Sequence, residues 1–181
     1  MELGIGMFGD MAYDFRAKKY QNPASRLKEI IEEVKLADEL GIDIFAMGEH
    51  HREDYAVSAP EIILAALATV TKNITLSSGV NVISSADPVK LYKDFTTIDL
   101  LSGGRAEIMA GRGSFIESFP VFGYKLDDYN ELFSEKLELL LELQKNKPVT
   151  WEGNHRAPLN NVTMYPRAQR KIPISIAVGG T

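Results

Sequence analysis

The chain has 181 residues, 45% of them apolar and 25% charged, which is typical of one globular domain with a sizeable core. Its net charge of -5, without a Lys/Arg block, argues against nucleic acid or an anionic membrane surface as the main partner. The lack of cysteine excludes disulfides, thiolate nucleophiles and zinc–cysteine sites.

The amino terminus lacks the basic start and long apolar run of a signal peptide. The longest apolar stretch, residues 62–68, is too short to span a bilayer. We therefore expect a cytoplasmic protein without a membrane segment.

Five apolar runs predict β-strands, and four amphipathic patterns between them predict helices. The strands are expected over residues 3–8, 42–47, 74–78, 105–110 and 174–178, and the helices over residues 24–40, 59–70, 87–103 and 128–144. Ser58 is the expected cap of the second helix, which is apolar on more than one face and should therefore be well buried. Asp87 and Pro88 open the third helix and Gly103 closes it. This alternation predicts a parallel sheet in a single domain.

The connection over residues 146–171 is long for a helix-to-strand link. Apolar residues at 149–151 and 162–164 flank a turn at 152–154, which predicts a short hairpin before the fifth strand. Trp151 and His155 are expected to stabilise this hairpin.

A parallel sheet of this kind is either an open doubly wound sheet or part of a (β/α)8 barrel. The glycines of the first strand lie within it, and Ile116 replaces the third glycine of a dinucleotide fingerprint that would begin at Gly111. We therefore predict an α/β fold of the parallel (β/α)8 TIM-barrel type, with only the first five β/α units present.

Unusual residues follow the predicted strands, where parallel α/β folds build their ligand sites. His50 and His51 are two of only three histidines and are candidate proton donors or acceptors. Adjacent residues usually point to opposite sides, so a metal site that includes Glu49 is disfavoured. Two loop histidines that bond backbone groups or cap the next helix are the alternative, and spacing alone favours it.

Arg112, between two glycines after the fourth strand, could reach a phosphate or pair with a neighbouring carboxylate. Arg105 lies at the opposite end of that strand, so we expect it to be structural. Phe115, Phe119 and Phe122 either line an apolar pocket or pin a loop.

Taken together, four ordered motifs resemble the bacterial luciferase-like flavin-dependent monooxygenases. They are residues 42–51 (IDIFAMGEHH), 86–89 with 100–105 (ADPV and LLSGGR), 109–113 (MAGRG) and 173–180 (PISIAVGG). Each motif is weak alone, but their order and spacing extend over essentially the whole chain.

The resemblance implies a barrel that binds reduced FMN at the carboxyl ends of its strands and uses O2 on a small organic substrate. Its implied residues are His50 as acid/base near the flavin's reactive edge and a non-prolyl cis peptide at Gly79–Val80 against the ring. Arg112 would help to hold the phosphate, and Gly179 and Gly180 would begin another part of that site. The reduced flavin is often supplied by a separate reductase.

Two departures qualify the resemblance. Gly111 replaces a reactive cysteine of the luciferase subunit, which argues against light emission. Full-length relatives are nearly twice as long, so we expect the first portion of such an enzyme, as a truncated chain, a shortened gene product or one part of a split barrel. Open sheet edges would then favour a homo-oligomer. An F420-dependent oxidoreductase of the same fold and a non-catalytic flavin-binding protein are the alternatives, and a long-chain aldehyde, an alkane or a sulfonate would each suit as substrate.

Overall fold

The computed structural model describes residues 1–113 and 115–178, and a parallel sheet forms its centre. The strand order is β1 (Gly4–Met7), β4 (Ile44–Met47), β5 (Thr75–Ser78), β7 (Ala106–Gly111) and β10 (Ile174–Ile176), with β6 (Asn81–Val82) pairing with β7. This order follows the chain without reversal, as in a barrel wall and unlike a doubly wound sheet. All five predicted strands are present; β6 is not foreseen by the apolar runs.

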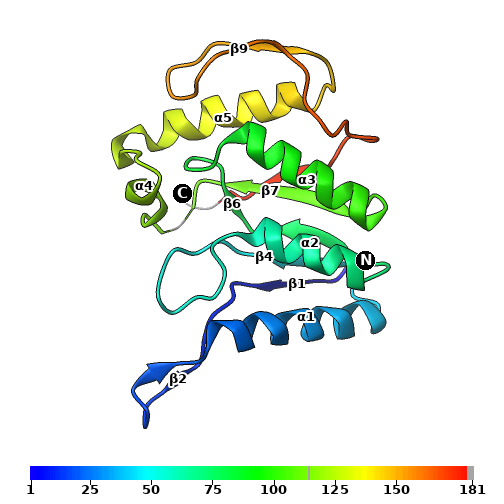
Figure 1. The fold of residues 1–181 in the computed structure, drawn as a ribbon, viewed down its shortest axis with the longest axis vertical. Coiled ribbons are helices and arrows are strands. Elements are labelled where there is room, and N and C mark those ends of the chain that lie inside the picture. Colours follow the sequence, from blue (N-terminus) through cyan, green and yellow to red (C-terminus); the bar gives the residue numbers. More distant parts are fainter. Residues whose placement is uncertain (114, 179–181) are drawn as a thin grey trace.

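Four long helices follow the strands and pack against one another in chain order, α1 on α2, α2 on α3 and α3 on α5. Their bounds are α1 (Pro23–Glu39), α2 (Pro60–Val70), α3 (Pro88–Ser102) and α5 (Tyr129–Leu143). Figure 1 shows α2 and α3 side by side over the strands. Two short elements, α4 (Ser118–Val121) and a 3-10 turn (Leu126–Asp128), precede α5 and are also not foreseen.

The core lies between the sheet and these helices. Alternate strand residues such as Phe45, Leu76 and Ile108 are fully buried against helix residues such as Leu64 and Phe95. Burying a side chain of this size contributes about 1.5–3 kcal/mol. The apolar side chains that recur every second residue in the strands therefore pack against those that recur about every 3.6 residues in the helices, in one apolar layer.

Helix boundaries confirm one predicted cap and correct another. The Asp87 carboxylate accepts the Lys90 N–H at 2.9 Å, and Gly103 ends α3 with φ of 70°, as predicted. Ser58 does not cap α2, because Ala59 is the N-cap residue and no side chain accepts a hydrogen bond there. The helix is well buried, as expected, at Ile63, Leu64 and Leu67, whereas Ile62 is 67% exposed.

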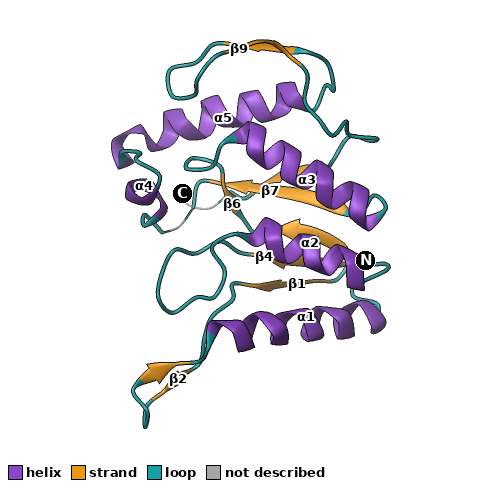
Figure 2. Ribbon diagram, in the orientation of Figure 1, coloured by secondary structure: helices purple, strands orange, loops and turns teal. Residues whose placement is uncertain are grey.

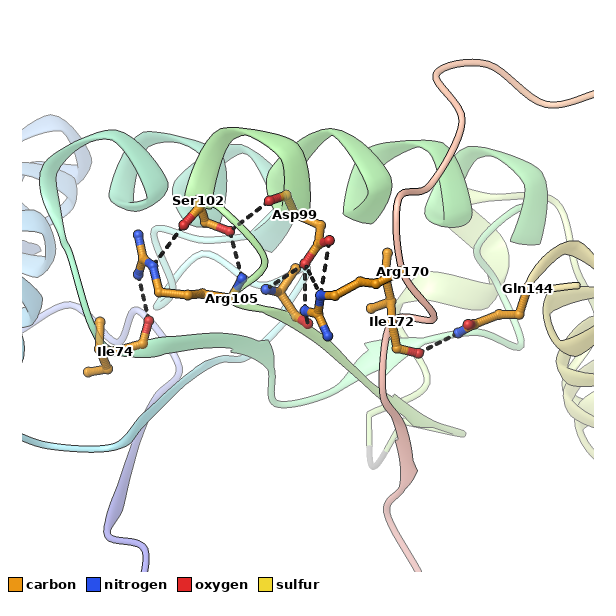
Figure 3. Close-up of polar contacts among 8 residues, drawn as sticks. Ile74, Asp99, Ser102, Arg105, Gln144, Arg170 and Ile172 are labelled. Carbon is orange, nitrogen blue, oxygen red and sulfur yellow. Dashed lines mark hydrogen bonds and ion pairs between the residues drawn. The ribbon is translucent and has the colours of Figure 1, made fainter. Parts of the chain in front are cut away.

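A polar network joins the elements at the amino ends of β5, β7 and β10 (Figure 3). Arg105 donates to the carbonyls of Ile74 at 2.6 Å and Ser102 at 2.9 Å, which confirms its structural role. The Asp99 carboxylate accepts from Arg170 at 3.0 Å and from the Ala106 N–H at 3.2 Å. This end of the sheet is thus held by the buried Asp99 and by two partly buried arginines, which bind backbone groups and, in Arg170, the Asp99 carboxylate.

Two antiparallel hairpins extend from this body (Figure 2). The predicted excursion is β8 (Val149–Trp151) with β9 (Leu159–Val162), and the Glu135 carboxylate of α5 accepts the backbone N–H groups of residues 154–156. The second hairpin, β2 (Tyr13–Asp14) with β3 (Lys19–Tyr20), is not predicted by the sequence pattern. Among the described residues, no helix is long and apolar enough to cross a membrane.

Candidate functional site

Two neighbouring cavities lie at the carboxyl ends of the strands, and the Gly79–Val80 peptide lines both of them. This peptide follows β5 and is cis. The Gly79 N–H donates to the Met47 carbonyl at 2.7 Å, which fixes the peptide beside the end of β4. The cis bond that the resemblance implies is therefore present at the boundary between the two cavities.

The larger one, called the large cavity below, has a volume of about 430 Å³, within the usual range of small-molecule sites. Its remaining lining residues are Gly111, Arg112, Gly113, Tyr129, Ala177 and Val178. Arg112 donates to Asn130 Oδ1 at 3.1 Å, and its guanidinium lies 5.5 Å from the Tyr129 ring centroid. None of the ion pairs among the described residues involves Arg112, so its charge is available to a ligand.

The second cavity, called the small pocket below, has a volume of about 50 Å³. Its lining residues other than Gly79 and Val80 are Phe8, Glu49, His50, His51, Val82, Gly113, Phe115, Glu117 and Ser118. It therefore combines apolar walls with carboxylate, imidazole and hydroxyl groups.

His50 is 9% exposed and lies among three aromatic rings. It stacks on Tyr55 with ring centroids 4.2 Å apart, and the edges of Phe8 and Phe115 approach it at 5.3 and 4.9 Å. Burial lowers the pKa of His50 below 6.5, and the nearby charge of Arg52 adds to this effect. Among the described residues, His50 Nδ1 has no hydrogen-bond partner. The ring is thus a neutral imidazole at pH 7 with a buried nitrogen ready for a ligand.

His51 lines the same pocket as His50, which corrects the expectation that they point to opposite sides. Both belong to a loop after β4, where the alternation of a strand no longer applies. Glu49 Oε1 lies 2.9 Å from His51 Nε2, and Glu49 Oε2 accepts the Val82 N–H at 3.1 Å. No group of three or more metal-ligating side chains occurs within the described part of the chain.

Gly111 and Gly79 allow the close contacts that shape the peptide between the cavities. A Cβ on Gly111 would lie 2.5 Å from Val80 Cγ2, and one on Gly79 would lie 2.9 Å from the Ala46 Cβ. Real Cβ atoms do not approach other atoms so closely, so both positions require glycine if Val80 is to keep its place.

The three phenylalanines of the loop after β7 have different environments. Phe115 lines the small pocket, Phe119 is 2% exposed in the interior, and Phe122 is half exposed with its ring 5.4 Å from His51. Both readings of this group are therefore partly right. His155 lies at the hairpin, 3.4 Å from the Glu131 carboxylate and away from both cavities, in agreement with its predicted position.

The sequence predicts His50, Gly79, Val80 and Arg112 at one end of the sheet, and the structure also has them there. Gly179 and Gly180 lie outside the described residues. The cavity residues that the sequence did not indicate are Phe8, Val82, Glu117, Ser118 and Tyr129, and Tyr55, which stacks on His50, was also not foreseen. Only Phe8 carried a usable signal, because it directly follows β1.

A model of the luciferase-like monooxygenase family matches residues 7–181. The chain belongs to this family. Its barrel-type fold agrees with a monooxygenase from Streptomyces bottropensis, RslO1, at a TM-score of 0.86 and 29% identity, over 97% of this chain and 53% of that one. The oxygenating constituent of 3,6-diketocamphane monooxygenase from Pseudomonas putida, solved with FMN, has a TM-score of 0.83 at 21% identity, over 97% and 51%, and supports the fold alone.

Among curated relatives, the N-acetyl-S-alkylcysteine monooxygenase of Bacillus subtilis is 31% identical over 89% of this chain and 48% of its own length. The oxygenase component of the flavin-dependent trigonelline monooxygenase of Acinetobacter baylyi is 26% identical over 77% and 38%. The chain spans about half the length of the curated relatives that it matches.

A flavin cofactor fits the residues at this site. The large cavity, of about 430 Å³, is lined by Gly79, Gly111 and Gly113 together with Arg112 and Tyr129. His50, whose Nδ1 has no partner among the described residues, lines the adjoining pocket. An aromatic ring system with a phosphate tail matches this combination of a glycine-lined cavity and a cation that makes no ion pair among the described residues.

Proposed function

We propose that the chain forms the flavin site of a luciferase-like monooxygenase that uses reduced FMN and O2 on a small organic substrate. The observation that carries this proposal is the meeting of two cavities at Gly79–Val80, one with a free arginine and one with a buried neutral histidine. Bound reduced flavin would supply the two electrons that activate O2.

Arg112 would bind the phosphate. Its guanidinium is held by Asn130 and lies over the Tyr129 ring, so it is oriented before a ligand arrives. Tyr129 is itself fixed, because its hydroxyl donates to the Gly113 carbonyl at 3.1 Å. Gly79, Val80 and Gly111 would hold the ring system.

His50 would act as the acid/base. Its lowered pKa keeps the imidazole neutral at pH 7, and the three surrounding rings fix its plane. Its Nδ1 would take up or deliver a proton at the edge of the small pocket. The apolar walls formed by Phe8, Phe115 and Val82 would keep water from competing for that proton.

The test is the rate at which O2 reoxidises reduced FMN bound to the chain, followed by flavin absorbance across pH 5 to 8. We expect a step in the pH dependence of the reoxidation rate below about pH 6.5. The variant His50→Gln should remove this step and change the reoxidation rate by about a hundredfold. FMN affinity should stay within about threefold, because His50 would act on the proton rather than hold the cofactor. His155→Gln, a histidine at the hairpin, is the matched control. An unchanged rate in His50→Gln would contradict the assigned role.

The finer parts of the proposal are the choice of FMN, a separate reductase and a homo-oligomer. The printed name of the A. baylyi relative, an oxygenase component, supports a reductase partner. A solved structure of the same fold with an F420–acetone adduct, at 19% identity and a TM-score of 0.74, keeps F420 as the alternative cofactor. Titration with both cofactors separates these two possibilities. Flavin binding without faster reoxidation would identify a non-catalytic flavin-binding protein.

A further inference from the structure

Three buried polar atoms of the small pocket have no hydrogen-bond partner among the described residues: His50 Nδ1, Glu117 Oε2 and Ser118 Oγ. Buried polar groups in native proteins are nearly always paired, because an unpaired group loses its hydration without replacement. Ser118 is 3% exposed and His50 is 9% exposed, so bulk water does not serve them. Because all three residues line one pocket, a ligand bound there can complete their hydrogen bonds.

We propose that the small pocket binds the polar head group of the substrate and selects one that donates hydrogen bonds, a hydroxyl or an ammonium group. Glu117 imposes this choice. Its Oε1 faces Arg52 Nη1 at 3.8 Å, whereas Oε2 is buried and free. A carboxylate oxygen only accepts hydrogen bonds, so the ligand has to donate one.

Ser118 and His50 complete the recognition. The Ser118 hydroxyl can donate or accept, and His50 Nδ1 does either according to its tautomer. A hydroxyl group both donates and accepts, and an ammonium group offers three donors, so either can serve Glu117 and at least one other atom. An aldehyde or a sulfonate offers acceptors alone and leaves Glu117 Oε2 unpaired.

The charges around the pocket favour the same ligands. Both acids that line it, Glu49 and Glu117, would repel an anionic head group. The oxygens of Glu49 are already bonded to His51 and the Val82 N–H. Arg52 does not line the pocket; it binds Asp54 at 2.9 Å and lies 5.2 Å from the Phe115 ring centroid. Glu117 is therefore the acid of this pocket that keeps a carboxylate oxygen without a partner among the described residues.

The size of the pocket limits what enters. A volume of about 50 Å³ accommodates a hydroxyl or ammonium group with its first carbon, since one water occupies about 30 Å³ in the liquid. The apolar walls at Phe8, Phe115 and Val82 suit that carbon. The remainder of the ligand would leave the pocket past Gly79–Val80, the peptide that lines both cavities.

This inference deepens the proposed function, on which it rests for the identification of the ligand as substrate. The test uses four probes with one body: benzyl alcohol, benzylammonium, benzaldehyde and benzoate. Each is titrated into the chain without flavin, and the ring signals of the three histidines are followed by NMR. His50 reports the pocket and His155 reports a site at the hairpin. FMN binding is measured separately by fluorescence.

We expect benzyl alcohol and benzylammonium to shift the His50 signal saturably, with affinities at least about tenfold above those of benzaldehyde and benzoate. Glu117→Gln should reduce the preference for benzylammonium over benzoate by about tenfold, whereas Glu152→Gln, the same change on the hairpin, should not. Ser118→Ala should lower the affinity for benzyl alcohol, and it serves as a second variant if Glu117→Gln is unstable.

Equal affinity for all four probes, or an unchanged ratio in Glu117→Gln, would overturn the inference. If FMN binds while the probes show no preference, the head-group site fails and the flavin site stands. If the probes show the preference while FMN does not bind, the head-group site stands and the proposed function fails.

Discussion

Gly111 at the end of β7 lies directly against Val80, the second residue of the cis peptide, so closely that a Cβ on Gly111 would be 2.5 Å from Val80 Cγ2. Position 111 thus has no space for a side chain in this chain. The contact joins β7 to the peptide that separates the two cavities. The shape of the proposed flavin site therefore depends on glycine at position 111.

Gly111→Ala should displace Val80 and distort both cavities. We expect a loss of about 1–3 kcal/mol in the free energy of unfolding, the usual cost of an overpacked contact, and an FMN affinity lower by about tenfold. Urea unfolding and FMN fluorescence would measure the two effects. Gly6→Ala in β1 is the control, since its nearest neighbour would be the Ala46 carbonyl oxygen at 3.9 Å. Equal behaviour of the two variants would refute the role of the contact.

Asp38 ties the end of α1 to the segment before β5, because its carboxylate accepts the N–H groups of Lys72, Asn73 and Ile74 at 2.7–2.8 Å. Burial acts to raise the pKa of Asp38, but these hydrogen bonds outweigh it and lower the pKa below 3.8. A lowered carboxyl pKa contributes stability above the unfolded-state value, and that stability is lost as pH falls through the folded-state value.

Asp38→Asn should therefore lower the free energy of unfolding at pH 7 by about 1–3 kcal/mol. The difference from wild type should shrink below about pH 4, where the wild-type carboxyl also becomes protonated. Denaturant unfolding at several pH values checks this, with the exposed Asp127→Asn as control. A difference that persists undiminished at pH 2 would show that the charge of Asp38 is not the cause.

Lys136 is a fully buried cation on α5. Its ammonium donates to the Ser84 carbonyl at 2.8 Å and lies 3.8 Å from the Tyr124 ring centroid. Burial lowers the pKa of Lys136 to about 8, although Asp87 and Glu135 partly oppose the shift. Between that pKa and the ordinary lysine pKa of 10.5 the unfolded chain binds more protons, so this group makes stability rise with pH across the interval.

Lys136→Met should remove this rise. At pH 7 we expect the variant to be as stable as wild type or more stable by roughly 1–2 kcal/mol, because a buried charge is replaced by an apolar chain of similar volume. The advantage should fade as the pH approaches about 10. Thermal unfolding from pH 7 to 10 measures it, beside the exposed Lys125→Met. Parallel profiles of wild type and Lys136→Met would contradict the titration of this lysine.

The two outer strands of the sheet, β1 and β10, each have a partner on one side only among the described residues. Unpaired strand edges pair readily with another chain, so we expect self-association in size-exclusion chromatography with light scattering. Ile176→Lys places a charge on the β10 edge and should shift the distribution toward monomer, whereas Leu101→Lys on α3 should not. A compact wild-type monomer at all concentrations would disprove the expectation.

Much of this architecture is predictable because it follows from local periodicity. The strands and long helices begin and end within about two residues of the apolar patterns, and Asp87 and Gly103 act as their side-chain chemistry implies. The strand-end rule brings His50 and Arg112 to the same edge of the sheet. Short elements such as β6 and the β2–β3 hairpin are not predicted, because two-residue strands carry no periodic signal.

The interior of the site is less predictable, because its contacts join loops that are distant in sequence. Tyr55 stacks on His50 only because the loop after β4 folds back, with the His50 N–H donating to the Val57 carbonyl at 3.0 Å. Glu117 and Ser118 reach the small pocket through the loop after β7. No rule of sequence spacing relates these positions, so their place in the site can be found only from the folded structure of the loops.

In the proposed site, Arg112 and the glycine-lined cavity bind the flavin through its phosphate and its ring. The most direct test is a fluorescence titration of the 181-residue chain with FMN and with riboflavin, which lacks the phosphate, for wild type and Arg112→Gln. We predict saturable quenching by FMN and an affinity about tenfold lower in Arg112→Gln, with riboflavin affinity unchanged by the substitution. No quenching by FMN, or equal loss of FMN and riboflavin binding in Arg112→Gln, would contradict it.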